Sequence, residues 1–98
     1  MMKNWKETTV NLGSVKQNST RVIKFESTRL LDIVSVTPGC PGCTKFVDYK
    51  DNVLTIKYTS DSVPRHLKHE GSTINKIVTI QYEDHTEEVL RFIGFLKQ

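Results

Sequence analysis

Residues 53–59, VLTIKYT, are the stretch that best decides the fold. Leu54, Ile56 and Tyr58 alternate with polar residues, and a period of two places the two sets on opposite faces of an extended chain. One apolar face and one polar face are typical of a strand that packs on a core from one side. We therefore predict a strand here.

Further apolar runs bounded by turn residues recur along the 98-residue chain, at the spacing of a sandwich or barrel. Alanine is absent and β-branched residues are abundant, which favours strand over helix. The predicted strands cover residues 5–12, 20–26, 30–37, 45–49, 53–59, 76–82 and 88–95. The third is apolar on both faces, which predicts a central strand. The chain is thus expected to be all-β, a single antiparallel sandwich of about seven strands.

The length allows one domain over residues 1–98 and excludes folds such as the eight-stranded α/β barrel. The inward-facing positions of the predicted strands supply the core. They are Ile23, Phe25, Ile33, Leu54, Ile56, Tyr58, Val78, Ile80, Tyr82, Leu90 and Phe92. Trp5 and Phe95 fall outside this set, and each is a candidate anchor for another protein if it is exposed.

The net charge is +3, but the basic residues are scattered and form no dense stripe, which argues against nucleic acid as a partner. The sequence also offers no nucleophile motif such as G-x-S-x-G and no phosphate-binding glycine loop, so we do not expect an enzyme. No window has the apolar length of a secretory signal or a membrane span. We therefore expect synthesis in the cytoplasm and no membrane partner.

Successive antiparallel strands reverse direction, so loops alternate between the two ends of the domain. The loops 14–19, 38–44 and 60–75 then share one end. Four basic residues gather at or beside that end and are the predicted partner-binding set: Lys16, Lys45, Arg65 and Lys68. Acidic residues lie at or near the other end: Asp51, Glu83, Asp84, Glu87 and Glu88. This separation would orient the domain on an acidic partner surface.

Cys40 and Cys43 have the C-x-x-C spacing that lets two thiolates reach one metal or form a redox pair. His66 and His69 are placed by strand direction at the same end, so these four residues are a candidate zinc site. The alternatives are a disulfide, a redox pair, or two thiols packed as small apolar groups. We favour packing and no cofactor. A cytoplasmic chain meets a reducing environment, which disfavours a disulfide, and the 22 residues between Cys43 and His66 match no standard zinc finger.

Several motifs follow one another in order: LGSV at 12–15, IKF at 23–25, IVSVTPGCPGCT at 33–44, LTIKY at 54–58, IVTIQY at 77–82 and LRFIGFL at 90–96. This order resembles the DUF1573 family, whose members are immunoglobulin-like β-sandwiches. The most specific match is the Cys-Gly-Cys-Thr pattern at 40–44, which carries one extra residue, Pro41. Residues 27–29 replace the family's Asn-x-Gly, and its proline-glycine pair is spread out as Pro64 and Gly71.

The resemblance implies a function as well as a fold. Short stand-alone members that resemble this chain occur among tailed-phage virion proteins, whereas many bacterial members are exported. It therefore implies a non-enzymatic virion component, a capsid-decorating protein or a neck or tail module. Its partners would be capsid or tail proteins, or further copies of itself in an assembly. The alternative is a bacterial protein-binding module with a Cys/His zinc site.

Overall fold

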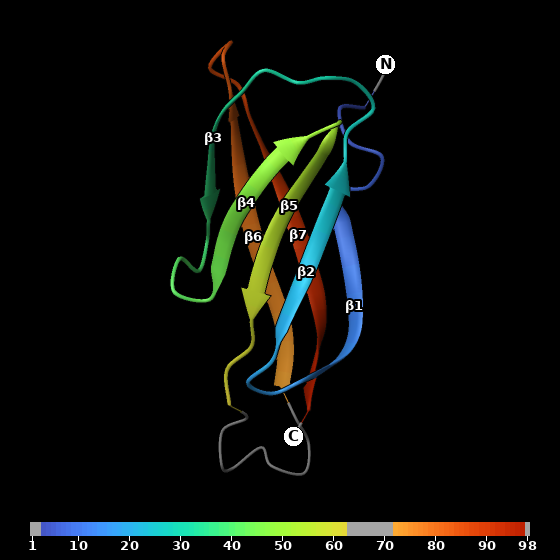
Figure 1. Cartoon of the computed structure of the whole chain (residues 1–98), viewed down its shortest axis with the longest axis vertical. Helices are drawn as coiled ribbons and strands as arrows, with labels where there is room; N and C mark the ends of the chain where they lie inside the picture. The colour runs from blue at the N-terminus through green and yellow to red at the C-terminus, as the bar shows by residue number, and fades with distance from the viewer. Residues whose placement is uncertain (1–2, 63–71, 98) are drawn as a thin grey trace.

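The computed structural model describes residues 3–62 and 72–97. Every regular secondary-structure element in these ranges is a β-strand. The strands are β1 (Thr9–Lys16), β2 (Thr20–Glu26), β3 (Ile33–Pro38), β4 (Thr44–Lys50), β5 (Val53–Thr59), β6 (Ser72–Tyr82) and β7 (Glu87–Lys97). They form a four-stranded sheet in the order β1-β7-β6-β3 and a three-stranded sheet in the order β2-β5-β4 (Figure 1). The predicted all-β sandwich of about seven strands is confirmed.

The strand order is that of an immunoglobulin-like sandwich. β2, β5 and β4 correspond to strands B, E and D of that fold, and β3, β6 and β7 correspond to C, F and G. β1 lies at the edge of the sheet that contains β3, β6 and β7, and it runs parallel to β7. The other pairings are antiparallel, so the prediction of an antiparallel sandwich is correct except at this one edge.

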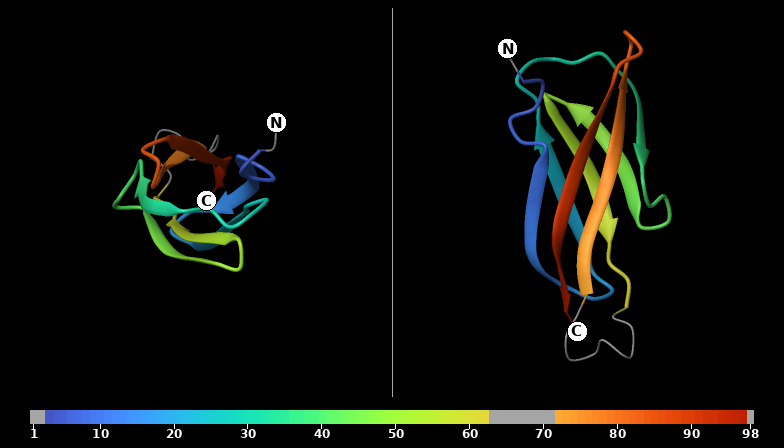
Figure 2. Two further views of the ribbon diagram at one scale, coloured as in Figure 1. Left: turned by 90° about the horizontal axis from the view of Figure 1, so that it is seen from above. Right: turned by 180° about the vertical axis from the view of Figure 1, so that it is seen from behind.

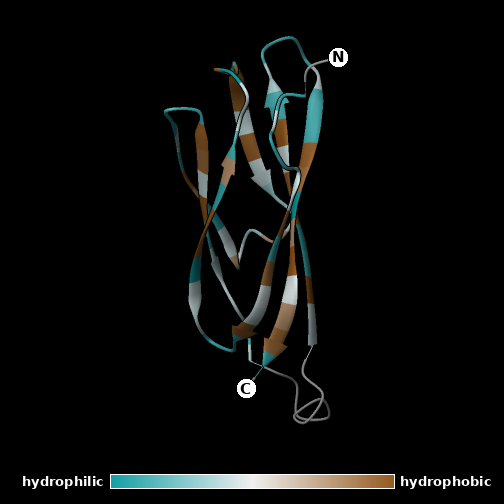
Figure 3. Ribbon diagram, turned by 90° about the vertical axis from the view of Figure 1, so that its right-hand side faces the viewer, coloured by the Kyte–Doolittle hydropathy of each residue, from teal (hydrophilic) through white to brown (hydrophobic). Residues whose placement is uncertain are grey.

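The core lies between the two sheets, which face each other as two layers in Figure 2. Apolar residues recur along the strands that form these layers (Figure 3). Every predicted core residue is buried except Ile33, which is half-buried. The structure adds further buried apolar side chains that the sequence did not assign to the core: Trp5, Val15, Leu31, Cys43, Ile74 and Leu96. The described residues contain no helix that could cross a membrane.

β3 is an edge strand, so the prediction of a central strand at 30–37 is wrong. A β-bulge lies between Ile33 and Ser35, and Val34 sits in it with 63% of its surface exposed. Because a bulge inserts one residue, it changes which side chains point inward. The run that looks apolar on two faces therefore includes residues that face solvent, Leu30 and Val34 among them.

The first strand begins at Thr9 rather than at residue 5. Trp5 forms an isolated bridge with Ser27 instead, and the backbone N–H of Lys6 donates to the carbonyl of Glu26 at 2.9 Å. The segment before β1 therefore lies against the end of β2 in the opposite sheet. It closes one end of the sandwich and buries Trp5 there, so Trp5 does not meet the condition of exposure under which it was a candidate anchor.

Strand direction distributes the loops as predicted, over an elongated molecule of 45 × 24 × 20 Å. Residues 27–32, 51–52 and 83–86 form the upper end in Figure 1. Residues 17–19 and 60–62 form the lower end, and the cysteine loop 39–43 turns on the same side. That loop stops short of the tip, because Pro38 pairs with Val78, well inside β6.

Candidate interaction surfaces

The cysteine loop joins β3 to β4, the edge strands of the two sheets. The backbone N–H groups of Cys43 and Thr44 both donate to the carbonyl of Cys40, at 3.2 and 2.9 Å. The N–H of Gly39 donates to the carbonyl of Ile77 at 2.8 Å, which ties the loop to β6. This tight turn is fixed to the sandwich on both sides.

Cys40 and Cys43 form a disulfide in the structure, so the favoured interpretation of two packed free thiols is corrected. The turn places the two Cα atoms 5.5 Å apart, within the range that a disulfide spans. Cys43 is nevertheless buried against the core, as the packing interpretation expected. No group of three metal-ligating side chains occurs in residues 3–62 and 72–97. His66 and His69 lie outside the described residues, so the four-residue zinc site stays a prediction.

Of the four residues predicted to bind a partner, Lys16 lies at the lower end, and Lys45 lies near the start of β4, beside the cysteine loop and above the tip. Lys16 ends β1 and pairs across the sheet with Lys97, the last residue of β7. Lys45 pairs with Lys57, and a cavity of about 340 Å³ lies beside them. All four lysines are exposed. Arg65 and Lys68 lie outside the described residues, so their part of the prediction is untested.

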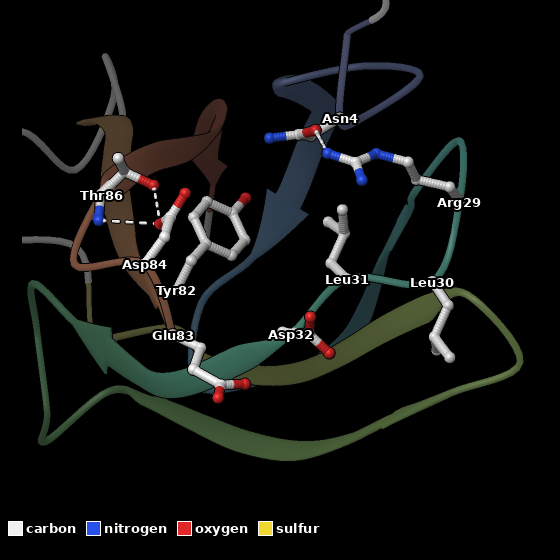
Figure 4. Close-up of a pocket in the computed structure, with 9 residues that line it drawn as sticks. All are labelled: Asn4, Arg29, Leu30, Leu31, Asp32, Tyr82, Glu83, Asp84 and Thr86. Atoms are coloured by element: carbon white, nitrogen blue, oxygen red, sulfur yellow. Dashed lines mark hydrogen bonds between the residues drawn. The ribbon is translucent and has the colours of Figure 1, made fainter.

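The upper end carries a cavity of about 450 Å³ between the 27–32 connection and the β6–β7 hairpin (Figure 4). Its lining combines one guanidinium with three carboxylates and two leucines, and comprises Asn4, Arg29, Leu30, Leu31, Asp32, Tyr82, Glu83, Asp84 and Thr86. Nη2 of Arg29 donates to Oδ1 of Asn4 at 2.9 Å, which holds the guanidinium toward the N-terminal segment. Thr86 donates through its side chain and its backbone N–H to Asp84, and these bonds lower the pKa of that carboxyl.

A chain of hydrogen bonds joins the segment before β1 to β6 and β7 at the upper end. Nε1 of Trp5 donates to the hydroxyl of Tyr82 at 2.8 Å, and that hydroxyl donates to Oε1 of Glu88 at 2.7 Å. Nδ2 of Asn4 donates to the same carboxylate oxygen at 2.6 Å. Burial, followed by the bond to Glu88, raises the pKa of Tyr82. The chain fixes the residues before β1 onto β6 and β7. The sequence analysis did not predict these hydrogen bonds, because Asn4 and Trp5 come close to Tyr82 and Glu88 only in the folded chain.

Replacing Tyr82 with phenylalanine is expected to reduce the free energy of unfolding by about 1–2 kcal/mol at pH 7, because the Trp5 N–H loses its acceptor. The raised pKa gives the effect a pH dependence. Above about pH 10 the unfolded chain releases the Tyr82 proton while the folded chain keeps it, so the unfolded state binds fewer protons and stability falls as pH rises. Denaturant titrations at pH 7 and above 10 should show a weaker alkaline loss in the variant. Equal alkaline losses would contradict this role.

Four of the seven exposed large apolar side chains of the described residues lie on β3, β4 and the connection before β3, and β3 and β4 are neighbouring strands of the two sheets. We call Leu30, Val34, Phe46 and Val47 the open flank. β4 has a bulge between Phe46 and Asp48, so Val47, like Val34, occupies a bulge in an edge strand. The two valines are 44% and 63% exposed. Sequence periodicity did not reveal this surface, because each bulge changes the inward and outward pattern.

No protein-family profile and no curated protein matches the chain. Among solved structures, it is similar to the SrpA adhesin from Streptococcus sanguinis, with a TM-score of 0.56 at 8% sequence identity. The match covers 87% of this chain and 50% of the adhesin chain, so this chain spans half the length of that protein. At this identity the likeness concerns the fold, and it agrees with the β-sandwich described above.

Proposed function

We propose that this domain is a non-enzymatic interaction module that docks on another protein through the open flank. The observation that carries the proposal is the pair of bulges in the neighbouring edge strands β3 and β4, each of which exposes a valine. Edge strands in soluble proteins are usually protected by charges, proline or bulges. Here the bulges interrupt the regular pairing edge, but they present apolar side chains rather than charged ones.

The geometry favours docking by side chains over addition of a strand from the partner. A strand needs an uninterrupted row of backbone donors and acceptors, and both flank strands lack one at the bulge. Val34 and Val47 instead offer small, rigid apolar surface, and Phe46, 45% exposed, offers an aromatic anchor beside them. Exposed apolar surface of this kind is typical of protein interfaces.

Within this class, the motif resemblance supports a component of a tailed-phage virion, with a capsid or tail protein as the partner. The chain would then be a structural part of the particle, produced in the host cytoplasm. Antibodies against the purified chain should detect it in virions purified on density gradients, from cultures in which its gene is expressed. A chain that remains wholly in the soluble host fraction would contradict the virion assignment.

The docking surface itself is tested with Val34→Lys combined with Val47→Lys. Two charges placed at the centre of an apolar interface should weaken binding to the purified particle protein by about 30-fold or more, measured by calorimetry. The matched control is Val22→Lys with Val89→Lys, two valines of similar exposure, 54% and 47%, on the outer sheet faces. Thermal melts should be alike for both variants. Equal loss of binding in the control would show that the flank is not the contact.

A further inference from the structure

A cavity of about 610 Å³ lies on the outer face of the four-stranded sheet, the face turned to the viewer in the right panel of Figure 2. The register of β1, β7 and β6 arranges six of its lining residues in two rows across the three strands. The first row is Asn11, Ile93 and Asn75, and the second is Ser14, Phe95 and Thr73. In each row the middle position is apolar and both outer positions carry an uncharged amide or hydroxyl group.

The bulge in β1 produces this arrangement. Between Asn11 and Ser14, β1 has two residues, Leu12 and Gly13, where β7 has Gly94 alone. The extra residue shifts the alternation, so Asn11 and Ser14 both lie exposed on the outer face. A Cβ atom on Gly13 would meet no other atom within 4 Å, so the missing side chain leaves open space between the two rows.

Two internal hydrogen bonds fix the amides that flank Ile93. Oδ1 of Asn11 accepts from the backbone N–H of Gly13 at 2.8 Å, and Oδ1 of Asn75 accepts from Nη1 of Arg91 at 2.5 Å. Because the amide oxygens are engaged, the amide nitrogens are oriented to donate to a ligand. Phe95, a candidate anchor from the sequence, is 37% exposed in the next row. Donors held in this way lose little freedom when a ligand binds.

The chemistry of the lining selects the class of ligand. The described residues that line the cavity carry no charge, so it lacks the cation that an anionic ligand needs and the carboxylates that a metal ion needs. A purely apolar partner would leave the amides and hydroxyls without hydrogen-bond partners. A sugar matches both features, because its C–H face packs on the negative face of an aromatic ring and its hydroxyls donate and accept around the edge.

The size of the cavity agrees with this class. The two rows cover about 10 Å across the strands and about 7 Å along them, an area that one sugar ring with its hydroxyls fills. We propose that this cavity binds an uncharged sugar unit of a glycan. Contact with one unit in an open groove gives a weak affinity, with a Kd of about 1 mM, and several copies of the domain acting together would strengthen it. The proposal goes beyond the proposed function, because it uses the outer sheet face and not the open flank.

NMR titration of the isotopically labelled chain tests the proposal with four neutral trisaccharides as probes: cellotriose, maltotriose, mannotriose and N-acetylchitotriose. Each is added to about 20 mM, well above the expected Kd. With at least one of them, saturable shifts are expected at the backbone and side-chain amide signals of Asn11 and Asn75 and at the backbone amide of Phe95. If none of the four shifts these signals, or if the shifts fall elsewhere on the domain, the proposal is wrong.

Variants then assign the binding to this cavity. Phe95→Ala and Asn75→Leu should each weaken binding of the active probe by about 10-fold or more, whereas Phe95→Tyr keeps the ring and should bind like the wild type. The matched control is Phe46→Ala, which removes a phenylalanine of similar exposure, 45% against 37%, from the open flank and should leave sugar binding unchanged. An equal loss in this control would refute the site.

Two further outcomes are decisive. Undiminished binding by Asn75→Leu would show adsorption on an apolar surface and overturn the assignment to a sugar. The Val34→Lys, Val47→Lys variant should lose docking on the particle protein and keep sugar binding, so this proposal and the docking proposal can fail separately. Loss of sugar binding in that variant, with an unchanged melting temperature, would place the sugar on the open flank and contradict the site proposed here.

Discussion

Replacing Trp5 with alanine is expected to lower the free energy of unfolding by about 4 kcal/mol, within the usual range for removing a large buried aromatic side chain. Trp5 is 1% exposed and packs edge-on against Tyr49, with ring centroids 6.2 Å apart. Its loss leaves a cavity at the upper end and removes the N–H that donates to Tyr82. For a domain of this size such a loss is a large fraction of total stability. Denaturant titration followed by circular dichroism measures it.

Trp5→Phe is the matched control for the packing part of this effect. It keeps an aromatic ring and loses the indole N–H, so it should cost about 1–2 kcal/mol. Trp5 is the chain's one tryptophan, so the emission of the wild-type chain should be blue-shifted when folded and should shift to the red on unfolding. A Trp5→Ala variant that melts within about 2 °C of the wild type would contradict the burial of this residue.

The sequence could not predict the position of Trp5, since it lies between Lys3 and Lys6 near the start of the chain and belongs to no alternating run. Its burial follows from a non-local contact. The segment crosses to β2 of the other sheet, where Trp5 bridges Ser27 and reaches Tyr82. A period-two pattern reports local structure, and this contact joins residues far apart in the chain.

Alternation predicted β5 and β2 with their observed bounds, because neither strand contains a bulge. It failed where a bulge changes the phase. The run before Pro38 appeared apolar on two faces, yet Val34 points to solvent from a bulge at the sheet edge. The open flank was therefore invisible in the sequence, although its residues are ordinary strand formers.

The surfaces at the two ends were predictable in part, because loop placement depends only on the reversal of strand direction. That argument placed Lys16 and Lys45 on the side of the lower end, as the structure has them. It could not reveal that they face Lys97 and Lys57, since cross-strand neighbours depend on register. The disulfide was one of several states open to the C-x-x-C spacing, and the sequence could not choose among them.

Substituting Gly94 with alanine is expected to destabilise the domain by about 2–3 kcal/mol, the upper part of the usual cost of overpacking. Gly94 lies on the inward side of β7, opposite the bulge that Leu12 and Gly13 form in β1. A Cβ atom there would meet the carbonyl oxygen of Gly13 at 2.9 Å and Cβ of Leu12 at 3.3 Å. Both atoms belong to or adjoin the β1 backbone, so relief would require the parallel β1–β7 pairing to shift.

Two other glycines separate this clash from general effects of adding a methyl group. Gly42 has no atom within 4 Å of an added Cβ and no positive φ, so Gly42→Ala should change stability by less than about 0.5 kcal/mol. Gly13 has equally open space but a φ of 68°, so Gly13→Ala should cost about 1 kcal/mol through backbone strain. Thermal unfolding of the three variants should therefore rank Gly94→Ala as the least stable. If the Gly94→Ala and Gly42→Ala variants have the same melting temperature, β1 does not lie against β7 as closely as the bulge requires.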